Sequence, residues 1–227
     1  YEKIVFSAEP KIDGISASLK YIDGIFTLGL SRGDGKTGED ITSNLKTIKE
    51  IPKKINKSNF PKILDVRGEV YISKSDFKKI NKQFANPRNA AGGSLRQKDH
   101  NETKKIPLKF MAYAFGLVDP INFKKQSEYL DLLKEWGFKI SPLNKLLGSV
   151  EEIYKYYKTL EKKRSEIDYD LDGLVYKVDD LSLQKRLGFV SNSPRWAIAH
   201  KFSAEKGISI IKNIEIQVGR TGALTPV

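Results

Sequence analysis

The chain has 227 residues, with 40 lysines and arginines against 28 acidic residues, and so carries a net charge of +12. It contains no cysteine, which excludes disulfides and thiolate metal sites, and its two histidines argue against a zinc site. No signal peptide is visible, and no apolar run reaches the roughly 20 residues of a membrane-spanning helix. A balance this basic fits a polyanionic partner, with nucleic acid the leading candidate, although a lysine-rich solvated surface would give the same charge.

A short apolar run near the N-terminus leads into Glu-Pro-Lys-Ile-Asp-Gly at residues 9–14. A lysine followed by Asp-Gly often marks a turn, so the stretch is ambiguous by itself. Its chemical interpretation makes Lys11 a nucleophile that becomes attached to a nucleotide.

Two strands are predicted early in the chain, at residues 3–8 and 15–31, and Asp23-Gly24 is typical of a β-hairpin turn within the second. The stretch that follows, residues 31–40, is rich in glycine. Glycines permit a tight loop with exposed backbone N–H groups. The stretch is not a Walker A loop, because the upstream glycine of that motif is missing.

Residues 63–72 form another predicted strand, whose alternation divides its side chains between two faces. Arg67, Glu69 and Tyr71 share one face, and the other face is apolar. The charged face indicates either an exposed side of a sheet or a polar cleft.

Asn86 followed by Pro87 is typical of a helix start. The small side chains of residues 90–95 would let the backbone approach another surface closely. Arg88 and Arg96 flank this stretch, as they would flank a phosphate backbone. Tight packing of the helix against the core is the alternative explanation.

The middle of the chain mixes strands and helices. Residues 109–118 read as a strand and residues 127–137 as a capped amphipathic helix that ends in glycine. Ser149 and Glu152 form a capping box for a helix to about residue 164. The order of elements indicates an α+β arrangement.

Two later strands carry lysines that the packing of a core does not explain. In residues 170–180, Lys177 shares a face with Gly173. In residues 194–202, the bulky side chains are expected in the core, and the opposite face presents Lys201 beyond two alanines, which leaves room for a ligand. An edge strand with a lysine that reaches solvent is the alternative.

Together these stretches resemble the nucleotidyltransferase superfamily of DNA ligases, RNA ligases and mRNA capping enzymes, and most closely the adenylation domain of bacterial NAD-dependent DNA ligase. The resemblance implies an α+β nucleotidyltransferase fold (ATP-grasp-like) of antiparallel sheets flanked by helices over residues 1–217, with residues 218–227 as the start of a truncated OB-fold domain. Six motifs carry it, in the family's order: Glu-Pro-Lys-Ile-Asp-Gly (9–14), Ser-Arg-Gly-Asp-Gly-Lys-Thr-Gly-Glu-Asp (31–40), Val-Arg-Gly-Glu-Val (66–70), Asn-Pro-Arg-Asn-Ala-Ala-Gly-Gly-Ser-Leu-Arg-Gln (86–97), Asp-Gly-Leu-Val-Tyr-Lys (172–177) and Pro-Arg-Trp-Ala-Ile-Ala-His-Lys-Phe (194–202).

The resemblance implies that Lys11 attacks the α-phosphorus of NAD, releases nicotinamide mononucleotide and keeps AMP as a phosphoramidate. The attacking amine must be neutral, which nearby cations favour, and the resemblance assigns this effect to Lys177, Lys201 and Mg²⁺ (or Mn²⁺). The same charges would stabilise the anionic transition state. AMP would then pass to the 5′-phosphate of nicked double-stranded DNA, and the adjacent 3′-hydroxyl would displace it to seal the strand.

The resemblance also implies a site for the adenylate part of NAD. Glu9 would accept a hydrogen bond from the adenine amino group, and Tyr113 would stack on the base. Arg32 would bind the ribose-phosphate side, and Glu69 a ribose hydroxyl or a metal. The full cofactor-binding set is Glu9, Lys11, Arg32, Glu69, Tyr113, Lys177 and Lys201.

Asp13 joins Lys11 in the implied catalytic set, because Asp13 and Asp172 would order the lysines and the metal. The implied metal ligands are Glu69 and Asp172, and no zinc is expected within this chain. Salt-sensitive contacts with the phosphates of nicked DNA are assigned to arginines. These are Arg88, Arg96 and Arg164.

Two alternatives remain: an ATP-dependent DNA or RNA ligase, and a non-catalytic basic DNA-binding module. The stretches Arg-Gly-Asp-Gly and Asn-Pro-Arg-Asn favour the NAD-dependent family, and a binding module would leave Lys11, Glu69 and Lys177 unexplained. We expect a cytoplasmic monomer that makes no membrane contact. Because the family's nicotinamide-recognising part would precede this chain, we expect the chain alone to react poorly with NAD.

Overall fold

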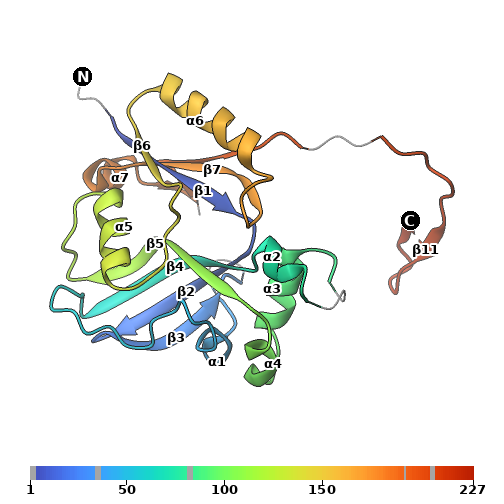
Figure 1. Ribbon diagram of the computed structural model, residues 1–227, viewed down its shortest axis with the longest axis horizontal. Coiled ribbons are helices and arrows are strands. Elements are labelled where there is room, and N and C mark those ends of the chain that lie inside the picture. The colour runs from blue at the N-terminus through green and yellow to red at the C-terminus, as the bar shows by residue number, and fades with distance from the viewer. Residues whose placement is uncertain (1–3, 34–36, 81–83, 192, 205–207) are drawn as a thin grey trace.

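The computed structural model describes residues 4–33, 37–80, 84–191, 193–204 and 208–227. Within these residues, two four-stranded antiparallel sheets form the body of the molecule (Figure 1). Sheet A has the order β10 (Ala197–Lys201), β7 (Leu171–Val178), β1 (Phe6–Ile12) and β6 (Lys145–Leu147). Sheet B has the order β3 (Ile25–Ser31), β2 (Ile15–Ile22), β4 (Ile63–Tyr71) and β5 (Lys109–Asp119). The α+β class with antiparallel sheets is therefore confirmed.

Helices surround the two sheets, and α6 (Val150–Lys163) crosses the outer face of sheet A (Figure 1). The other helices are α1 (Thr42–Leu45), α2 (Lys74–Phe77), α3 (Pro87–Leu95), α4 (His100–Lys104), α5 (Gln126–Glu135) and α7 (Leu181–Leu187). None of the described helices combines the length and apolar character needed to cross a membrane.

Two short strand pairs complete the fold. The first joins β8 (Phe189–Val190) to β9 (Ser193–Pro194), and the second joins β11 (Ile216–Val218) to β12 (Leu224–Pro226). The β11–β12 hairpin lies apart from the two sheets (Figure 1). The domain boundary expected between residues 217 and 218 falls inside β11.

The hairpin turn predicted between β2 and β3 is present. Asp23 and Gly24 have φ angles of 47° and 74°, which are the positive values that a type I′ turn needs at both central positions. A Cβ atom on Gly24 would lie 2.2 Å from the carbonyl oxygen of Ile55. Glycine is therefore required here both by its backbone conformation and by its surroundings.

Side-chain caps start several helices as the sequence indicates. The Asn86 side chain accepts a hydrogen bond from the Asn89 N–H ahead of Pro87, and Ser149 accepts one from the Glu152 N–H. The helix expected from residue 127 instead begins at Gln126 and has no cap from its own N-cap side chain.

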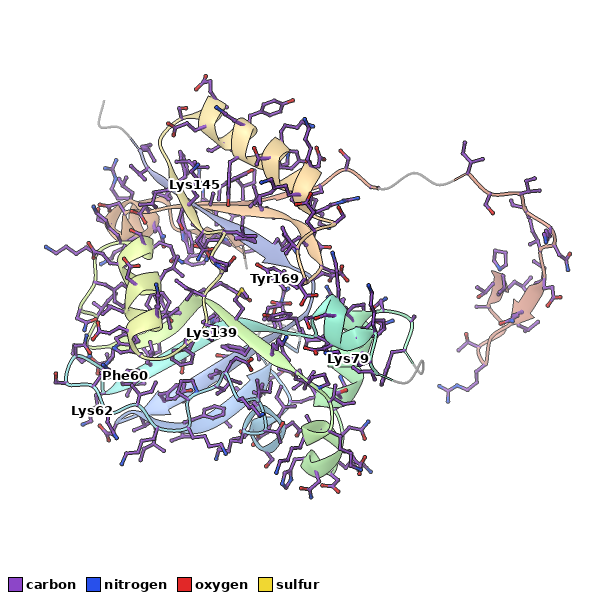
Figure 2. All side chains as sticks on the ribbon, viewed as in Figure 1. Phe60, Lys62, Lys79, Lys139, Lys145 and Tyr169 are labelled. Carbon is purple, nitrogen blue, oxygen red and sulfur yellow. The ribbon has the colours of Figure 1, made fainter. Side chains whose placement is uncertain are left out.

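Sheet B encloses the larger core. Leu64, Val66 and Val70 of β4 are completely buried in it, as the apolar face of that strand predicts. The opposite face of β4 turns toward sheet A. Its Tyr71 belongs to the core cluster of sheet A and packs against Tyr169, which Figure 2 labels, with ring centroids 5.5 Å apart. On this face Glu69 and Tyr71 are buried between the sheets, whereas Arg67 is exposed, so only the part of the face near the end of the strand forms a polar interior.

The bulky face of residues 194–202 is less buried than expected. Phe202 is buried, and His200 stacks on Tyr157 of α6 with ring centroids 3.9 Å apart, but Ile198 is 67% exposed. β10 is the edge strand of sheet A, and His200 is exposed as well despite its ring contact. The prediction that this face forms core is wrong for Ile198 and His200.

We predict that Leu64→Ala lowers the free energy of unfolding by about 2–5 kcal/mol, because it opens a cavity in the core of sheet B. The matched control is Leu146→Ala on β6, whose leucine is 50% exposed. Its change should stay within about 0.5 kcal/mol. Urea unfolding of both variants measures the difference, and equal losses would contradict the assignment of the core.

Candidate active site

The three predicted lysines lie on the inner face of sheet A, and the strand pairing gives their spacing. On the ladder, Lys11 lies opposite Gly173, and Gly173 lies opposite Lys201. Lys177 lies opposite Ser7, four residues farther along β7. Paired residues in an antiparallel sheet share a face, and a strand rises about 3.3 Å per residue, so the two positions on β7 lie about 13 Å apart. We call these positions the Lys11 end and the Lys177 end.

A buried ion pair occupies the Lys177 end. Lys177 Nζ donates to Glu9 Oε2 at 2.6 Å and to the carbonyl oxygen of Tyr113 at 2.7 Å. The other carboxylate oxygen, Glu9 Oε1, accepts from Ser7 Oγ at 3.0 Å and from Gln126 Nε2 at 2.9 Å. The paired side chains are only 8% and 4% exposed. Removing two charges from water is costly unless further hydrogen bonds compensate, which Ser7, Gln126 and Tyr113 provide here.

Tyr113 closes the Lys177 end from sheet B. Its carbonyl oxygen also accepts from Gln126 Nε2 at 3.0 Å, and Lys177 Nζ lies 5.4 Å from the centre of its ring. That distance is within the range of a cation–π contact. Burial raises the pKa of the Tyr113 phenol to about 12, so the ring stays neutral at physiological pH.

At the Lys11 end, two ion pairs hold the motif residues. Lys11 Nζ lies 3.1 Å from Asp172 Oδ2, and Arg88 Nη1 lies 2.5 Å from Asp13 Oδ1. The backbone N–H of Asp13 donates to the carbonyl of Asp170 at 2.9 Å, which fixes the end of β1 against β7. The Lys11 and Asp172 side chains are 31% and 35% exposed, so a ligand can reach the amine.

Glu69 connects the Lys11 end to sheet B. Its Oε2 accepts from Ser16 Oγ at 3.0 Å, and Ser16 Oγ lies 3.4 Å from the hydroxyl of Tyr113. Burial raises the pKa of Glu69 to about 7, although the Ser16 hydrogen bond and the charges of Lys11 and Arg88 act in the opposite direction. The neutral and ionised forms of Glu69 are therefore both populated near neutral pH.

Three of the predicted arginines line one groove. Its volume is about 590 Å³, and Arg32, Arg88 and Arg96 line it together with Glu69 and Ser16. Arg96 Nε lies 3.8 Å from the nearest carboxylate oxygen and its side chain is 75% exposed, so its guanidinium remains accessible to an anion. The groove brings positive charge next to the Lys11 end, because Glu69 and Arg88 belong to both.

Of the two lysines expected beside Lys11, the structure places only Lys201 in its ladder row, and Arg164, expected to contact DNA, lies outside the groove. The Lys177 ammonium is committed to Glu9 and Tyr113, at the opposite end from Lys11. Lys201 lies in the ladder row of Lys11, but on the exposed edge strand. Arg164 ends α6, where its Nη1 donates to the carbonyl of Ser203 at 3.3 Å, and it does not line the groove.

The implied metal ligands do not form a metal site as the structure places them. No three acidic or histidine side chains of the described residues gather closely enough to hold an ion. Asp172 is paired with Lys11, and burial raises the pKa of Glu69 to about 7, which favours the neutral acid over the anion that a metal binds. We therefore derive no step through a metal ion.

Sequence reasoning missed two residues of this site. The sequence could have indicated Ser16, because strand alternation places it on the polar face and it pairs with Glu69 across the ladder. No sequence pattern indicates Gln126. Its position depends on Asp179, whose carboxylate accepts hydrogen bonds from the N–H and hydroxyl of Ser127 at the start of α5.

Comparisons with known proteins agree with the resemblance of the motifs. A DNA ligase of Pelagibacter ubique (strain HTCC1062) is 65% identical over 99% of this chain and 33% of its own length. A DNA ligase of Bradyrhizobium sp. (strain ORS 278) is 50% identical over 100% of this chain and 33% of its own length. The chain thus spans about a third of the length of the curated relatives it matches.

Among solved structures, a mycobacterial DNA ligase D complexed with ATP and MES is 13% identical, with a TM-score of 0.47 over 78% of this chain and 49% of that chain. That likeness is too low to carry an argument. The family of NAD-dependent DNA ligase adenylation domains matches residues 1–205, which is most of the chain. The chain therefore belongs to the family of NAD-dependent DNA ligase adenylation domains.

Proposed function

We propose that this chain carries out the adenylation step of an NAD-dependent DNA ligase. Lys11 Nζ, deprotonated to the neutral amine, attacks the α-phosphorus of NAD; the new N–P bond forms as the P–O bond to nicotinamide mononucleotide breaks, and the nitrogen gives up one proton to solvent. The observation that carries this proposal is the placement of Lys11, Glu9 and Lys177 on one sheet face, where the position of Glu9 lies about 7 Å and that of Lys177 about 13 Å from Lys11 along the ladder. That spacing suits a ligand with a base at one end and a phosphate at the other.

The Lys177 end suits adenine. Among the described residues, Lys177 uses two of its three N–H donors on Glu9 and Tyr113, and Glu9 Oε2 accepts only from Lys177. One donor and one acceptor therefore remain side by side. Adenine offers the matching pair, a ring nitrogen that accepts and an amino group that donates. Guanine and hypoxanthine present the reverse order, so Glu9 selects adenine and Tyr113 stacks on it.

The Lys11 end suits the phosphates. Asp172 holds the Lys11 amine in place by their ion pair, and Arg88 holds Asp13 at the end of β1. Lys201, in the same ladder row, supplies a cation for the charge that builds up on the phosphate oxygens. Arg32 in the adjoining groove binds the ribose-phosphate side, and Glu69 binds a ribose hydroxyl.

The later steps follow from the ligase family of the relatives. AMP moves from Lys11 to the 5′-phosphate of a nick in double-stranded DNA, and the 3′-hydroxyl then displaces AMP. Arg88 and Arg96 in the groove, with Arg164 beside β10, contact the DNA phosphates. The exposed guanidinium of Arg96 is the most accessible of these charges.

The direct test of the function is transfer of labelled adenylate to the protein. We expect slow labelling from NAD of the unchanged chain and, at the same rate, of Lys57→Ala, a variant of an exposed lysine in a loop before β4. Lys11→Ala should lower the rate by about 10⁶-fold, as loss of a nucleophile does in other enzymes. Label from ATP but not from NAD would contradict the proposed cofactor, and label on Lys11→Ala would contradict the nucleophile.

The raised pKa of Glu69 predicts that the stability of the fold depends on pH. Its pKa in the folded protein, about 7, lies above its ordinary value of 4.5, so the folded state binds this proton more tightly than the unfolded state. The stability from Glu69 is fully present below about pH 4.5 and is lost as the pH rises through about 7. Between about pH 4 and about pH 8, the unchanged chain should lose about 3 kcal/mol relative to Glu69→Gln. Urea unfolding across this range measures it, and a constant difference would refute the effect.

Arg96 predicts a change in the salt dependence of DNA binding. Removing one phosphate contact with Arg96→Ala should weaken binding to a nicked duplex and reduce the slope of log K against log salt by about 1. Lys57→Ala should leave the slope unchanged. Binding titrations at several salt concentrations measure both, and equal slopes for the two variants would remove Arg96 from the DNA-binding surface.

A further inference from the structure

We propose that Gln126 determines base specificity by holding the Glu9 carboxylate in the orientation that presents a free lone pair to the base. The inference rests on the proposed function, because it assigns a role within the adenine site. Gln126 would touch Glu9 rather than the nucleotide, so it acts as a positioning residue.

Gln126 is built into the Lys177 end. It is 2% exposed, and its Nε2 donates to Glu9 Oε1 at 2.9 Å and to the carbonyl oxygen of Tyr113 at 3.0 Å. Both partners are acceptors, so the NH₂ group and not the carbonyl of the amide must face them. Its two N–H donors thus join sheet A to sheet B through a single side chain.

These hydrogen bonds leave the two oxygens of Glu9 unequal. Oε1 accepts from Ser7 and Gln126, and two donors occupy its two lone pairs. Oε2 accepts from Lys177 and keeps one lone pair beside the ammonium. Only this orientation sets a free acceptor next to the remaining donor of Lys177. Without Gln126 the carboxylate plane can rotate, and its free lone pair no longer stays beside the remaining donor of Lys177.

The backbone around Gln126 keeps it in register with Lys177. Its N–H donates to the carbonyl oxygen of Asp179 at 2.7 Å, and the Asp179 carboxylate accepts from the N–H of Ser127 at 2.8 Å. Asp179 is 4% exposed and follows Lys177 by two residues. The end of β7 thus positions both the ammonium and the start of α5, which lies beside the two sheets in Figure 1.

Gln184 provides a matched control. It is also a buried glutamine, 6% exposed, and its Nε2 donates to the carbonyl oxygen of Val178 at 2.7 Å. Its side-chain amide therefore satisfies a backbone carbonyl near the same strand end, at a site separate from the Glu9 carboxylate. Any effect of losing a buried amide as such should appear equally in both residues.

The test compares dissociation constants for AMP and for IMP, which carries a carbonyl in place of the amino group. We expect Gln126→Met to reduce the preference for AMP over IMP by about tenfold, the worth of one hydrogen bond to a charged group. Gln184→Met should keep the preference within about twofold. Equal preferences in the unchanged chain and in Gln126→Met would overturn the proposal.

Two further variants separate this inference from the proposed function. If Glu9→Gln leaves the preference intact, the adenine site itself is wrongly assigned. If Glu9→Gln abolishes the preference and Gln126→Met does not, only the role of Gln126 is overturned. Should Gln126→Met fail to fold, Gln126→Asn keeps a buried amide but shortens the side chain, which removes its reach to Oε1. It is then expected to lower the preference, and no change would overturn the proposal.

Discussion

The arrangement of this domain depends on the buried ion pair between Glu9 and Lys177. Both side chains are almost wholly buried, so each charge requires partners, and the removal of one would cost about 3–5 kcal/mol by leaving the other uncompensated. The partners come from elsewhere in the fold: the carbonyl of Tyr113 on β5 and the amide of Gln126 on α5. The same hydrogen bonds therefore join the two sheets and shape the Lys177 end, so a change in the packing of the sheets would also change that end.

The Asp-Gly pair of β7 explains why the Lys11 end has room for a second cation. A Cβ atom on Gly173 would lie 2.1 Å from the carbonyl oxygen of His200 and 2.7 Å from the Cα atom of Lys201. Only glycine lets β10 approach β7 this closely, and the approach sets Lys201 in the ladder row of Lys11. Asp172, one residue earlier, holds the Lys11 amine. A short motif thus sets the strand spacing and orients the proposed nucleophile.

The parts of the fold predictable from sequence depend on local rules. The buried face of β4 follows from alternation, the Asp23-Gly24 turn from positive φ angles, and the start of α3 from the Asn86 cap. The unpredicted parts depend on pairing between distant strands. The β1–β7 register pairs Lys177 with Ser7, within reach of Glu9 and away from Lys11. The carboxylate of Asp179, just after β7, holds the start of α5 and so places Gln126. Ile198 is exposed because β10 is an edge strand, a matter of sheet order that the sequence pattern does not contain.

The central claim is that one nucleotide spans the inner face of sheet A, with its base at Glu9 and its phosphorus at Lys11. A crystal structure of the protein after adenylation tests it most directly. The account predicts a bond between Lys11 Nζ and phosphorus, with the adenine amino group within hydrogen-bond distance of Glu9 Oε2. An adduct on another lysine, or a base seated in the groove of Arg32, Arg88 and Arg96, would contradict it.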